Sequence, residues 1–122
     1  MIALKRLALS TVLLLALDFV YLTLTKSMFE EQIINIQRVI VEFKLVGAVI
    51  CYFFLALGLN YFILQNKKPV LDAFILGLVI YAVYESTNYA IFKKWGLQLA
   101  IIDTLWGGIL FALTAYLTYL VF

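Results

Sequence analysis

The chain has 122 residues, of which 66% are hydrophobic and 13% are charged, and its formal net charge is +2. Soluble domains carry about 25% charged residues, so this chain has more apolar side chains than its own interior can bury, and lipid must surround it. The mild charge and the lack of a long basic run exclude a nucleic-acid partner, and one cysteine without any histidine excludes the usual zinc and haem ligands. We therefore expect one integral membrane domain over residues 1–122, with the lipid bilayer as its partner and with no metal or other cofactor.

The first apolar run extends from Leu7 to Thr25 and is preceded by Lys5 and Arg6. A signal peptide begins in the same way. However, the run contains no small-x-small cleavage site, and Lys26 follows it instead of a mature soluble domain. We therefore predict an uncleaved first membrane span over residues 7–25.

The connection from Lys26 to Lys44 is longer and more polar than the other connections. Its apolar residues recur at helical spacing, and acidic and amide side chains occupy much of the remainder. This pattern predicts a short amphipathic helix in the membrane interface between spans one and two. The alternative is that its second half simply extends the second span.

Three further runs are long enough to cross a membrane, which takes about 20 apolar residues. They cover residues 45–65, 70–92 and 97–122. The separators 66–69 and 93–96 are so short that each should join adjacent antiparallel helices. The prediction is an all-α, four-helix transmembrane bundle with multiple membrane passes. The basic pair Lys5 and Arg6 favours both termini in the cytoplasm.

Three acidic residues lie well inside these spans: Asp18, Glu85 and Asp103. An ionisable residue at such a place costs roughly 2.5–3.5 kcal/mol on insertion scales, so it is rare and commonly functional. Asp18 and Glu85 each lie seven residues from the same membrane face and Asp103 lies six, which corresponds to about 10 Å and 9 Å at 1.5 Å per residue. Three carboxyl groups from three helices should therefore share one level of the membrane. Because like charges this close in a low dielectric cannot all ionise, at least one should carry a proton at neutral pH.

Each acid belongs to a polar stripe at helical spacing, and such stripes must face the bundle interior. The stripes predict a pocket that opens toward the side of the 26–44 segment. The candidate residues are Asp18, Tyr21, Tyr81, Tyr84, Glu85, Asn88, Asp103 and Trp106. We expect hydrogen bonds to the acids from Tyr81 or Tyr84, from Asn88 and from Trp106. The plain alternative is that these residues only hydrogen-bond helices together.

Other polar and small residues of the spans favour structural roles. We interpret Tyr52, Asn60 and Tyr61 as packing or interfacial residues and Trp95 as an interfacial anchor. The spacing of Gly47, Cys51, Phe54 and Gly58 predicts a helix contact face, and the Gly107–Gly108 pair predicts a close helix approach.

The polar residues also resemble those of a known family. The relevant motifs are Asp18-x-x-Tyr21, Tyr81-x-x-Tyr84-Glu85-x-Thr87-Asn88, Lys94-Trp95 and Asp103-x-x-Trp106-Gly107. Over essentially its whole length the chain resembles the four-span predicted membrane proteins called domain of unknown function 2177. That family's pattern has tryptophan at the place of Tyr21 and aspartate at the place of Glu85. The resemblance implies a membrane location and these polar positions, but no activity.

Three kinds of function fit these observations. A one-sided pocket of carboxylates and aromatics suits the binding or movement of a cation, a proton or an amine. The same pocket suits a small membrane enzyme acting on a lipid or isoprenoid-like substrate, although no nucleophile–base pair or cofactor motif accompanies it. The third kind is a structural subunit of a homo-oligomer or of a larger membrane complex.

Overall fold

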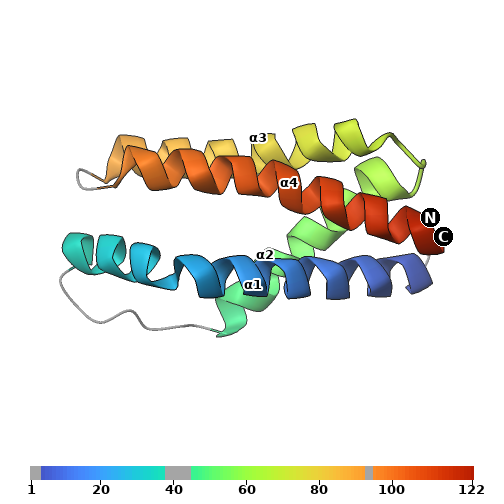
Figure 1. The fold of residues 1–122 in the computed structure, drawn as a ribbon, viewed down its shortest axis with the longest axis horizontal. Coiled ribbons are helices and arrows are strands. Elements are labelled where there is room, and N and C mark those ends of the chain that lie inside the picture. Colours follow the sequence, from blue (N-terminus) through green and yellow to red (C-terminus); the bar gives the residue numbers. More distant parts are fainter. Residues whose placement is uncertain (1–3, 38–44, 93–94) are drawn as a thin grey trace.

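The computed structural model describes residues 4–37, 45–92 and 95–122, and for residues 30 and 32–37 it describes the backbone alone. The elements are α1 (Leu4–Gln37), α2 (Leu45–Leu59), the π-helical turn η1 (Asn60–Leu64), α3 (Val70–Ile91) and α4 (Leu97–Val121). The described residues contain no strand, which confirms the predicted all-α class. Successive helices run in opposite directions, so Leu4 and Phe122 lie at the same end of the bundle (Figure 1).

Four stretches are long and apolar enough to cross a membrane: Leu4–Phe29, Leu45–Leu64, Val70–Ile91 and Leu97–Val121. They confirm the four predicted spans. Large apolar side chains, Phe19 and Val83 among them, are exposed on the outside of the bundle. In a bilayer this surface faces hydrocarbon chains, which supply the solvent that an apolar exterior requires.

Helix α1 is longer than the predicted first span because it continues without a break to Gln37. Its sequence contains no glycine or proline that would end it. The first part of the predicted 26–44 segment is therefore helical, as expected, but it continues α1 and is not a separate helix. Residues 38–44 of that segment lie outside the described residues.

The second span is less regular than the sequence suggested, because α2 passes into the π-helical turn η1 at Asn60. The Asn60 amide is buried in the bundle, where its Nδ2 donates to the Ala56 carbonyl oxygen at 2.8 Å and to Ser10 Oγ at 2.9 Å. A π-helical turn holds one residue more than an α-helical turn. Here it accompanies a polar link between α2 and α1 that the regular periodicity did not reveal.

Helices α3 and α4 form a closely packed antiparallel pair. A Cβ atom added at Gly77 would lie 2.2 Å from the Gly107 carbonyl oxygen, and one added at Gly107 would lie 2.3 Å from the Tyr81 ring. The predicted close approach at Gly107 and Gly108 is thereby confirmed, and Gly77 is its counterpart on α3. This contact fixes the spacing between the helices that carry Glu85 and Asp103.

Helix α2 does not pair closely with α3, although the short 66–69 turn led us to expect adjacent antiparallel neighbours. It crosses the bundle obliquely (Figure 1) and packs mainly against α1. The buried face of α2 carries Leu55, Ala56 and Leu59. They join a core cluster with Leu14 of α1 and Phe111 of α4.

Candidate functional site

Asp18 lies on the buried face of α1, and other helices supply donors to both of its carboxylate oxygens. The indole N–H of Trp106 on α4 donates to Oδ1 at 2.9 Å. The hydroxyl of Tyr52 on α2 donates to Oδ2. Asp18 therefore links three helices, and each of its two oxygens accepts a hydrogen bond.

Asp103 lies on α4 and is buried to the same degree as Asp18. The Tyr21 hydroxyl donates to its Oδ1 at 3.0 Å. The ring of Tyr21 stacks on that of Trp106, with 4.8 Å between centroids and 6° between planes. Tyr21 and Trp106 thus form one stacked aromatic pair that donates a hydrogen bond to each aspartate, Tyr21 to Asp103 and Trp106 to Asp18.

Glu85 on α3 is the third buried carboxyl group, and only 1% of its surface is exposed. The indole N–H of Trp95 donates to its Oε1 at 2.7 Å. Its Oε2 is buried and has no hydrogen-bond partner among the described residues. The Asp103 carboxyl group lies close enough to Glu85 for a direct electrostatic interaction, and Asp18 in turn interacts with Asp103. We call Asp18, Glu85 and Asp103 the carboxylate cluster.

The remaining candidate residues lie around the cluster but do not bind its oxygens in the described hydrogen bonds. The Tyr81 ring is half-buried and packs over Gly107. Tyr84 is 55% exposed and hydrogen-bonds Asn88 on the same helix. Among the described hydrogen bonds, Trp106 is the expected donor that reaches an acid, and Tyr81, Tyr84 and Asn88 do not. Tyr84 and Asn88 lie on a more outward face of α3, rotated from Glu85 by about 100° and about 60° respectively.

The donors that replace them are Tyr52 and Trp95, to which the sequence had suggested structural roles. Tyr52 lies seven residues from the start of α2, at the same membrane level as Asp18. The number of residues from the end of the span could therefore have indicated Tyr52 as a partner of Asp18, because the same count placed the three acids at one level. Trp95 is buried and not interfacial, since it folds inward from the connection before α4. Its spacing from Glu85 along the chain gave no indication of this contact.

The electrostatics of the cluster are unusual because, apart from the contact between Glu85 and Asp103, every described hydrogen bond to the three carboxyl groups comes from an uncharged hydroxyl or indole N–H. The predicted spans contain no lysine or arginine. Among the described residues, no three His, Cys, Asp or Glu side chains form a group able to hold a metal ion. Neutral donors stabilise an anion but do not cancel its charge, so full ionisation of the three carboxyl groups would leave their charge uncompensated.

An apolar layer lies on the deeper side of the cluster. Leu14, Leu110 and Phe111 have no exposed surface. Beyond this layer, one further helical turn along α1, the Ser10 hydroxyl accepts the hydrogen bond from Asn60. The two polar layers are thus separated by closely packed side chains.

Comparison with known proteins places the chain in a family. No curated protein and no solved structure matches it. Residues 3–120 match the family described as "Predicted membrane protein (DUF2177)", which is the resemblance that the polar motifs suggested. Tyr21, one of the residues of those motifs, donates from its hydroxyl to the buried Asp103. Since the match covers almost every residue, the chain belongs to the DUF2177 family of predicted membrane proteins.

Proposed function

We propose that the carboxylate cluster binds an organic ammonium ion in exchange for a proton. The observation that carries this proposal is the pairing of Glu85 and Asp103, two buried carboxyl groups whose described hydrogen bonds, apart from the contact between the two, all come from uncharged donors. One of their oxygens, Glu85 Oε2, is buried and accepts no hydrogen bond from a donor group among the described residues. This oxygen can accept a hydrogen bond either from a proton held within the pair or from a donor group of a ligand.

The exchange follows from charge. Two neighbouring carboxyl groups in a low dielectric cannot both ionise unless a cation joins them, so without a ligand they hold a proton between them. An ammonium ion brings one positive charge and up to three N–H donors. Its binding lets the second carboxyl group ionise, and the displaced proton leaves. Charge-assisted hydrogen bonds of this kind are about twice as strong as neutral ones.

The coordination offered by the cluster favours such a ligand over a hard metal ion. A calcium ion takes six to eight oxygen ligands, and magnesium demands near-octahedral geometry. Both Asp18 oxygens already accept hydrogen bonds from Trp106 and Tyr52. With these oxygens engaged, the cluster offers fewer free oxygens than a calcium or magnesium ion takes, whereas an ammonium group needs at most three acceptors.

The ligand would reach the cluster from one side of the membrane, because the layer of Leu14, Leu110 and Phe111 blocks the other side. With both termini in the cytoplasm, as Lys5 and Arg6 favour, that open side faces away from the cytoplasm. We propose this orientation together with the binding role.

Equilibrium binding of butylamine to the protein in phosphatidylcholine nanodiscs tests the proposal. Trp95 and Trp106 donate to Glu85 and Asp18, so tryptophan fluorescence should report occupancy. Removal of one charged hydrogen bond costs roughly 1.5–3 kcal/mol, or about ten- to hundredfold in affinity. Glu85→Gln and Asp103→Asn should each weaken binding by this factor.

The matched control is Asp72→Asn, which removes a carboxylate from the first turn of α3, far from the cluster. It should leave butylamine affinity unchanged. Release of one proton for each ammonium bound also makes the apparent affinity rise with pH, by up to about tenfold per unit. If the amide variants bind as the wild type does, or if the wild type shows no saturable binding, the acids serve only to join helices.

A further inference from the structure

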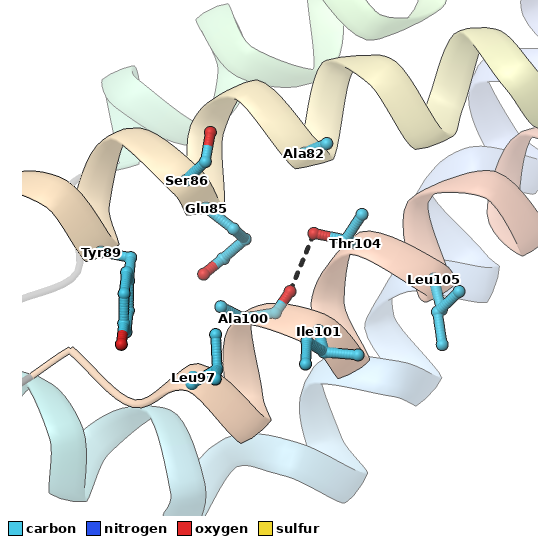
Figure 2. A pocket seen from close by; sticks show the side chains of 9 residues that line it. All are labelled: Ala82, Glu85, Ser86, Tyr89, Leu97, Ala100, Ile101, Thr104 and Leu105. Carbon is cyan, nitrogen blue, oxygen red and sulfur yellow. Dashed lines mark hydrogen bonds between the residues drawn. The ribbon is translucent and has the colours of Figure 1, made fainter.

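The outer seam between α3 and α4 contains a groove of about 280 Å³. Figure 2 shows its walls, with one set of residues from each helix. The lining residues are Ala82, Glu85, Ser86, Tyr89, Leu97, Ala100, Ile101, Thr104 and Leu105. The hollow exists because Ala82 and Ala100 are small where the neighbouring positions are large.

The groove combines an apolar rim with one acidic group at its base. The rim residues Tyr89, Leu97, Ile101 and Leu105 are each about half exposed, on the surface that faces lipid. Glu85 extends from α3 into the space between the helices, toward Ala100 (Figure 2). Among the described lining residues it is the only acidic or basic one, and its buried Oε2 accepts no hydrogen bond from a donor group in the described part of the chain.

We infer that this groove binds the chain of a single-chain amphiphilic amine, whose ammonium head reaches Glu85 from the lipid phase. The inference rests on the proposed function and names the class of ligand for the same cluster. Glu85 belongs both to the groove and to the cluster, so one ligand can fill the apolar seam and meet the acidic pair.

The size and depth of the groove select this class. Its volume lies just below the roughly 300–1,000 Å³ typical of small-molecule sites, which suits one chain and not a two-chain lipid. From Leu97 to Leu105 the seam runs about 12 Å along α4. In a bilayer the competing solvent is lipid, so the groove gains its affinity for the chain by close packing against it.

The test compares dodecylamine, butylamine and dodecanol as probes of the full chain in phosphatidylcholine nanodiscs. Affinities are referred to the amount of probe dissolved in the bilayer, measured with empty nanodiscs. Dodecylamine should bind at least about tenfold more tightly than butylamine, and dodecanol, which has no charge, should not compete. Ala82→Leu fills the groove and should weaken dodecylamine binding about tenfold, which is more than it weakens the binding of the short butylamine chain. Ala90→Leu, an exposed position of the same helix outside the groove, should change neither affinity.

The outcomes separate this inference from the proposed function. Glu85-dependent butylamine binding without any effect of chain length or of Ala82→Leu overturns the groove and leaves the cluster proposal intact. Absence of binding by both amines overturns both. If the Ala82→Leu variant fails to insert into the membrane, the wild-type protein is tested instead. A dodecylamine analogue with a photoactivatable group at its chain end then shows which helices line the bound chain. Attachment within the lining of α3 and α4 supports the groove, and attachment confined to α1 or α2 refutes it.

Discussion

Gly77→Ala should separate α3 from α4 and lower the stability of the protein. The new Cβ would lie 2.2 Å from the Gly107 carbonyl oxygen and 2.8 Å from the Cβ of Phe111. Carbon contacts are most favourable at about 3.5–4.0 Å, so the helices must move apart by roughly 1 Å. Overpacking of this kind costs about 1–3 kcal/mol. We expect the upper part of that range, because the nearest atom belongs to the backbone and cannot rotate away.

The matched control is Gly58→Ala on α2, where an added Cβ would meet nothing within 4 Å. Alanine exceeds glycine in helix propensity, so this variant should gain roughly 0.5–1 kcal/mol. Reversible unfolding in mixed micelles of mild detergent and dodecyl sulfate measures both free energies. Gly77→Ala should also weaken butylamine binding, since it moves Glu85 away from Asp103. Equal stability of the two variants would refute the close α3–α4 contact.

Three other predictions concern the supports of the cluster and the orientation of the chain. Tyr52→Phe removes a donor from buried Asp18 and should cost about 1–3 kcal/mol in the same unfolding assay; a neutral result would mean that the two groups do not meet. A double-mutant cycle of Ser10→Ala and Asn60→Ala should give a coupling energy of about 0.5–1.5 kcal/mol, whereas simple additivity would contradict the α1–η1 hydrogen bond. A cysteine introduced in the 66–69 turn should react with a membrane-impermeant thiol reagent only after the cells are opened; labelling of intact cells would reverse the proposed orientation.

The spans and the level of the acids followed from the sequence because the bilayer constrains both. Hydrocarbon thickness fixes the helix length, and the rise per residue then converts sequence position into depth. The count from each span's end placed Asp18, Glu85 and Asp103 at one level, and the structure brings their carboxyl groups together. Helical spacing likewise predicted the buried faces of α1 and α4.

The partners of the acids depended on tertiary details that periodicity does not contain. Helix α2 is an example, because the spacing of Gly47, Cys51, Phe54 and Gly58 predicted a helix contact face. The structure turns that face outward: Cys51 is exposed, as is 61% of Phe54, and the packed face carries Tyr52. Small residues permit a close approach without requiring one, so a regular pattern on α2 did not show which side meets α1. The inward fold of Trp95 arises in a connection, where no helical period applies.

The infrared spectrum of the protein in nanodiscs tests the proton–ammonium exchange most directly, because protonated and ionised carboxyl groups absorb separately. At neutral pH the wild type should show the carbonyl band of a buried, protonated carboxyl group. Saturation with butylamine should remove that band and increase the carboxylate bands, and Glu85→Gln should show no such amine-dependent change. A wild-type spectrum without the protonated band, or with a band that butylamine leaves unaltered, would contradict the exchange.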